Sequence, residues 1–143
     1  MIRVLIFSFT AMLALSANAD KKQAPLPWLG IAFTWAESDA HNRALHVRGV
    51  TPGGPAEKAG VRPGDLITAV NGARVDFGDE LEFLLYLEKR VPGERLRLQL
   101  VREGRILAAI VTLGQLADEA RPRWERNVRM ARARRAARER DRD

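Results

Sequence analysis

Few side chains in this sequence are of a type that does covalent or metal chemistry. The 143 residues include no cysteine, which excludes disulfides, thiolate metal ligands and a cysteine nucleophile. Beyond residue 19 the only serine is Ser38, and the two histidines, His41 and His46, lack Asp or Glu partners at metal-ligand spacing. Asp65 is better explained as a turn residue ahead of a strand than as a general base, which would need a partner in a cleft. We therefore expect no catalytic residue, no metal site and no cofactor.

Turn-forming residues are concentrated between Thr51 and Val75. A Pro-Gly-Asp turn predicts entry into the alternating strand Leu66–Val70, and Asn71-Gly72 predicts its reversal, because both central residues of a type I′ turn take positive φ. The stretch resembles the central signature of a PDZ domain, of the kind found in bacterial periplasmic proteases of the HtrA type, in this ordered set: Gly54-Pro55-Ala56, Ala59-Gly60-Val61, Pro63-Gly64-Asp65-Leu66-Ile67 and Val70-Asn71-Gly72.

The resemblance covers roughly Trp28 to Leu116, in the circularly permuted strand order of the bacterial form. It implies a carboxylate-binding loop and a peptide-pairing strand, built from Trp28, Leu29, Gly30, Ile31, Ala32 and Phe33. PDZ domains carry an apolar-Gly-apolar pattern there, and this chain has Leu29-Gly30-Ile31 where animal members have Gly-Leu-Gly-Phe. A glycine lets consecutive backbone N–H groups surround a carboxylate without a Cβ in the way. The alternative is a core strand with a glycine bend.

A helix is predicted over Asp79–Arg90, because acidic residues open it, basic residues close it, and a Pro-Gly pair follows. Its apolar residues cover more than one ordinary stripe. The resemblance accounts for this excess if one flank faces the core and another lines the peptide groove, where it implies Phe83, Leu84 and Leu87. The alternatives are a deeply buried helix and a helix that meets a partner chain.

Alternating residues predict a strand at Leu45–Val50 and a hairpin of Arg95–Arg102 with Arg105–Leu113, turned at Glu103-Gly104. Together with the resemblance, these elements predict an α+β fold. We expect a PDZ-like, partly open β-barrel or sandwich of about five to six strands with two helices, followed by an Arg-rich tail that is helical or disordered.

The positive charge is concentrated in the tail. The chain has a formal charge of +6, but residues 20–116 hold 13 basic and 12 acidic side chains, whereas residues 117–143 hold 10 arginines and 6 acids. Trp124, Val128 and Ala131 form a thin apolar stripe at helical spacing. We interpret the tail as a solvated or disordered extension; the functional alternative is contact with anionic lipid, nucleic acid or an acidic partner.

The first 19 residues have the composition of a secretory signal peptide. One basic residue precedes an apolar run that is shorter than the roughly 20 residues of a membrane span, and Ala17-Asn18-Ala19 closes it. Cleavage after Ala19 would leave a periplasmic or secreted protein, and an uncleaved segment would anchor it to the inner membrane. We expect a signal peptide at 1–19, a flexible lead-in at 20–27, a PDZ domain at 28–116 and a basic tail at 117–143.

These features predict a non-catalytic peptide-binding module that recognises C-termini or extended segments by β-strand addition. The expected partners are peptide or protein C-termini; a protease or an envelope protein is a further candidate partner. Nucleic acid is not expected, and membrane contact by the tail and the oligomeric state stay open. The alternative is a structural role in assembly, or a membrane-tethered adaptor or regulator of a separate protease that makes contact through the tail.

Overall fold

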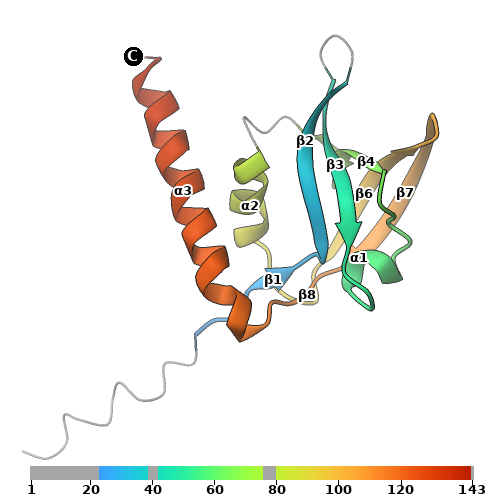
Figure 1. Cartoon of the computed structure of the whole chain (residues 1–143), viewed down its shortest axis with the longest axis horizontal. Coiled ribbons are helices and arrows are strands. Elements are labelled where there is room, and N and C mark those ends of the chain that lie inside the picture. Colours follow the sequence, from blue (N-terminus) through green and yellow to red (C-terminus); the bar gives the residue numbers. More distant parts are fainter. Residues whose placement is uncertain (1–22, 39–41, 76–79, 143) are drawn as a thin grey trace, which may run out of the picture.

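The computed structural model describes residues 23–38, 42–75 and 80–142. The expected signal segment 1–19 and His41 lie outside the described residues. A twisted antiparallel sheet forms the centre of the molecule, with strand order β2-β3-β4-β6-β7 and a short β5 paired to β4 (Figure 1). A second, two-stranded ladder joins β1 to β8. The strands are β1 (Pro27–Trp28), β2 (Ile31–Ser38), β3 (Asn42–Val50), β4 (Leu66–Val70), β5 (Ala73–Arg74), β6 (Arg95–Arg102), β7 (Arg105–Thr112) and β8 (Gly114–Gln115).

Two tight turns fix the register of the sheet. Asn71 and Gly72 both have positive φ, 51° and 81°, between β4 and β5. Glu103 and Gly104, at 49° and 73°, make the same kind of turn between β6 and β7. A two-residue turn of this type matches the twist of its flanking strands, so the alternating leucines of β6 all point to one face. The sequence prediction of both reversals agrees with the structure.

Three helices accompany the sheet: α1 (Pro55–Lys58), α2 (Glu80–Glu88) and α3 (Arg121–Arg140), which follows a 3₁₀ turn at Asp118–Ala120. The predicted α+β fold with an open sheet is confirmed, and the tail is helical. In Figure 1 the sheet, α2 and α3 lie side by side, with α2 in the middle, and α2 makes contacts with both β2 and α3.

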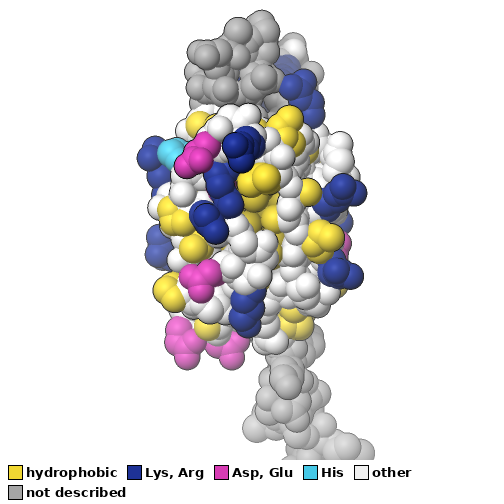
Figure 2. Space-filling model, turned by 90° about the vertical axis from the view of Figure 1, so that its right-hand side faces the viewer, with side chains coloured by type: hydrophobic (Ala, Val, Ile, Leu, Met, Phe, Trp, Pro, Cys, Tyr) yellow, Lys and Arg dark blue, Asp and Glu magenta, His cyan; other side chains and the backbone are white. Residues whose placement is uncertain are grey.

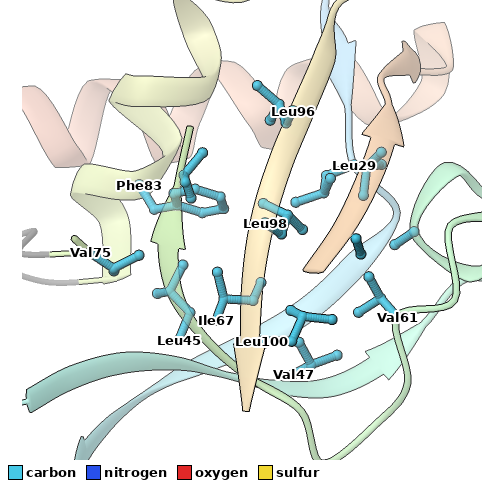
Figure 3. Close-up of a cluster of buried hydrophobic side chains, with 14 of the residues drawn as sticks. Leu29, Leu45, Val47, Val61, Ile67, Val75, Phe83, Leu96, Leu98 and Leu100 are labelled. Carbon is cyan, nitrogen blue, oxygen red and sulfur yellow. The ribbon is translucent and has the colours of Figure 1, made fainter. Parts of the chain in front are cut away.

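The core lies between the sheet and α2 (Figure 3). Leu96, Leu98 and Leu100 alternate inward from β6, and Phe83 of α2 points at them. Each of these side chains is at most 1% exposed. Burial of one such side chain contributes roughly 1.5–3 kcal/mol, so these contacts stabilise the packing of α2 on the sheet.

The tail packs on α2 instead of extending into solvent. Val128 and Ala131 are buried against Leu85, and Trp124 packs beside them. Arg132 forms an ion pair with Glu88, and Arg138 with Glu82 at 2.9 Å. The apolar stripe noted in the sequence is therefore a packing face within the chain, and the expectation of a solvated or disordered extension was wrong for the described part. No helix among the described residues is long and apolar enough to cross a membrane.

Candidate peptide-binding groove

The loop between β1 and β2 is held in place by its carbonyl groups. The Leu29 oxygen accepts from the Ala56 N–H at 3.1 Å, and the Gly30 oxygen accepts from the Thr51 N–H at 2.9 Å. Gly30 has φ +78°, and a Cβ at this position would lie 3.2 Å from Cδ of Pro55. Both the backbone conformation and the close approach of Pro55 therefore favour glycine here.

The N–H groups of this loop differ from its carbonyl groups in their hydrogen bonding. Among the described residues, the N–H groups of Leu29 and Gly30 donate to no other backbone group. Consecutive free N–H groups beside a positive-φ glycine are the arrangement that binds a carboxylate. The loop can thus act as an anion site.

β2 begins directly after this loop and lies at the edge of the sheet. Its register with β3 shifts between Ala32 and Phe33, which marks a bulge. Within the described part of the sheet, β3 is the only neighbour of β2. The other edge of β2 faces α2, so its unpaired backbone groups are available to an added strand.

A cavity of about 530 Å³ lies between this edge and α2. All six residues predicted from the loop and edge strand line it, and α2 contributes Leu84 and Leu87, also predicted, together with Leu81. A third group comes from the C-terminal segment and was not predicted. Its members are Leu116, Ala120, Arg123, Trp124 and Asn127.

Phe83 is not among the lining residues of this cavity. Its side chain is fully buried, with its ring centroid 5.3 Å from that of Phe33 and the two rings nearly perpendicular. Sequence reasoning placed Phe83 close to the groove because the helix register was not fixed. In the structure it supports the groove from the core side. Leu81, three residues before Leu84, shares the groove-facing flank instead.

Asp65 lies outside this cavity, and its carboxylate is buried and held by hydrogen bonds from the protein. It is 1% exposed, and its two oxygens accept from Nε and Nη2 of Arg102 at 2.8 Å each and from the Arg62 N–H at 2.8 Å. Burial alone would raise the pKa of Asp65, but the hydrogen bonds from Arg102 and Arg62 and the charges of both arginines outweigh it and hold the pKa below its ordinary value of 3.8. The same carboxylate raises the pKa of Arg102. Asp65 is thus an anchor of the turn before β4 that is ionised at neutral pH.

The face of the molecule that carries β7 and α1 has a different character. Figure 2 shows basic, acidic and apolar side chains interspersed on it. Ile106 and Ile110 of β7 are exposed there. No three of the His, Asp and Glu side chains in the described ranges come together as a metal site.

A glycine loop with free N–H groups, a free edge strand and a helix beside it are the parts of a PDZ domain. Residues 46–102 match the family model described as PDZ domain. The chain therefore contains a PDZ domain, and its relatives include HtrA-type proteases. It is 33% identical over 100 residues to the protein of Hahella chejuensis named "Probable periplasmic serine endoprotease DegP-like", covering 64% of this chain and 21% of that one. It is 32% identical over 78 residues to the "Serine protease Do-like HtrA" of Bacillus subtilis, covering 54% and 17%.

Solved structures share the fold. The "HtrA3 PDZ Domain Bound to a Phage-Derived Ligand (FGRWV)" superposes with a TM-score of 0.53 at 20% identity, covering 63% of this chain and 86% of that one. The "HtrA-type protease AlgW with decapeptide" gives a TM-score of 0.57 at 20% identity, covering 65% and 30%. This chain spans less than a quarter of the length of the two proteases matched by sequence, and the match lies in the PDZ part.

Proposed function

We propose that this domain binds the C-termini or extended segments of other proteins by adding them as a strand to β2. The observation that carries the proposal is the cavity between β2 and α2, because it joins an unpaired strand edge to a loop with two free N–H groups. A peptide added antiparallel to β2 would place its carboxylate at Leu29 and Gly30 and its alternate side chains against Leu81, Leu84 and Leu87.

The proposed activity is non-catalytic. The described residues of the groove are apolar except for Arg123 and Asn127, and neither of these is a nucleophile or a general base at neutral pH. We also propose a periplasmic location, supported by the composition of residues 1–19 and by the periplasmic DegP-like relative. The intact mass of the protein recovered from the periplasm would show cleavage after Ala19.

The test begins with selection of a peptide from a phage-displayed library of free C-termini on the purified protein. The selected peptide is then titrated by calorimetry as the free acid and as the C-terminal amide. We expect micromolar binding of the acid, about −8 kcal/mol at 1 μM, and clearly weaker binding of the amide. Equal binding of both forms would indicate internal segments rather than C-termini.

A matched pair of glycine variants ties the binding to the loop. Gly30→Ala and Gly104→Ala both place a Cβ at positive φ, which costs roughly 1–2 kcal/mol, but a Cβ at Gly104 meets nothing within 4 Å. We expect both variants to lose stability, with the larger loss in Gly30→Ala because its Cβ also meets Pro55, and we expect loss of peptide affinity only in Gly30→Ala. Equal affinity in the two variants would remove the loop from the site.

The alternative function, assembly through the tail, has a distinct signature. A domain with an unused groove would select no peptide from the library, and its size in solution would change when α3 is altered. Selection of a peptide family with a common C-terminal residue argues against that alternative.

A further inference from the structure

The start of α3 lies at the loop end of the groove. Arg132 contacts Glu88 and Arg138 contacts Glu82, so α3 runs antiparallel to α2 and its start lies toward the C-terminal end of α2. This end of α3 follows β8, which pairs with β1, and β1 leads directly into the Leu29-Gly30 loop. Figure 1 shows the beginning of α3 beside β1 and β8.

Several contacts fix this part of α3. The Arg121 guanidinium donates to the Ala24 oxygen at 2.9 Å, and the Leu116 N–H donates to the Leu26 oxygen at 2.9 Å. Trp124 packs against both the main core and the small cluster between α2 and α3. The helix start is therefore positioned as a wall of the cavity.

Arg123 is the only charged side chain among the residues that line the cavity. Arg132 and Arg138 form ion pairs with acids of α2, and Arg135 forms one with Glu139 at 3.9 Å. No acidic group in the described ranges forms an ion pair with Arg123. An arginine with no acidic partner at the end of an apolar groove favours an anionic ligand group.

We propose that α3 forms a third wall of the groove, in which Arg123 holds the terminal carboxylate of the peptide together with the Leu29 and Gly30 N–H groups. Trp124 and Leu116 then bound the pocket for the last side chain, which must be apolar. This inference rests on the proposed function, and it assigns a ligand contact to an element outside residues 46–102, the part that matches the PDZ model.

The test compares four binding affinities: those of the parent protein and of Arg123→Gln, each measured with the free-acid and the amide form of the selected peptide. We expect the variant to weaken binding of the acid about tenfold, the effect of one charge-assisted hydrogen bond at a partly exposed site. Binding of the amide should change less than about twofold, because the amide carries no charge to lose. Arg123 is exposed, so the variant should fold normally.

Arg129→Gln is the matched control, because Arg129 is exposed on the same helix but does not line the cavity. It should leave both affinities unchanged if long-range charge is not the cause. The proposal is overturned if Arg123→Gln binds the acid as tightly as the parent protein, or if it weakens acid and amide equally. Absence of binding to the parent protein would instead reject the proposed function itself.

Discussion

At the scale of single residues, Asp65 is a buried carboxylate whose contacts suit a structural role and not a catalytic one. Its oxygens receive three hydrogen bonds, and Arg102, which supplies two of them, also donates to the Gly60 oxygen at 2.8 Å. The group thereby ties the last turn of the α1 region to β4 and β6. A buried carboxylate with every contact made by donors is held ionised, which suits an anchor and not a proton carrier.

Replacement of this anchor has a predictable dependence on pH. Asp65→Asn removes the charge from a buried hydrogen-bonded group, and we expect a loss of about 2 kcal/mol in the free energy of unfolding near pH 7. Because the pKa of Asp65 is lower in the folded state than in the unfolded state, its stabilising contribution is present above the unfolded pKa and is lost as pH falls through the folded pKa. Urea unfolding of parent and variant should therefore show a difference that shrinks below about pH 4.

The control for this prediction is Glu139→Gln, which alters an ion pair of 3.9 Å between largely exposed side chains. Exposed pairs contribute little, so this variant should follow the parent at every pH. A difference between Asp65→Asn and the parent that stays constant down to about pH 2 would show that the charge of Asp65 is not what stabilises the fold.

At the scale of elements, α2 has three neighbours, and this explains its apolar excess. Phe83 faces the core, Leu84 faces the groove, and Leu85 packs against α3. The family resemblance implied one flank toward the core and one toward the groove, but it assigned Phe83 to the groove flank, whereas Phe83 lies in the core. The third was one of the alternatives considered, contact with a partner, but the partner is α3 of the same chain.

A pair of alanines on α3 can test this packing. Ala131 is fully buried against α2, whereas Ala133 is exposed. Ala131→Glu places a carboxylate and extra volume in the contact, and we expect it to lower the free energy of unfolding by roughly 1–3 kcal/mol. Ala133→Glu has the same helix propensity change and should be nearly neutral. Thermal unfolding followed by circular dichroism measures both, and equal midpoints would mean that α3 does not dock on α2.

At the scale of the whole molecule, the sequence predicted those elements whose structure is determined by residues close together in the chain. Both positive-φ turns, the strands β4, β6 and β7 and the helix α2 follow from turn chemistry and periodicity, which depend on near neighbours. The placement of α3 depends on long-range packing of a thin apolar stripe, Trp124, Val128 and Ala131, in a helix that contains nine arginines. Composition favoured a solvated tail, and the ion pairs with Glu82 and Glu88 that align the helix cannot be read from spacing along one element.

Because α3 docks on α2, the tail is part of the folded unit, and its removal should lower the free energy of unfolding. Deleting residues 118–143 uncovers Leu85 and removes the buried Val128, and we expect a loss of about 2–4 kcal/mol in the free energy of unfolding. Urea unfolding measures this loss. Deleting only residues 139–143 keeps both ion pairs with α2 and the buried face, and it should change stability little. If the longer deletion also unfolds like the parent, then α3 is an independent extension, and a third wall of the groove would have no structural support.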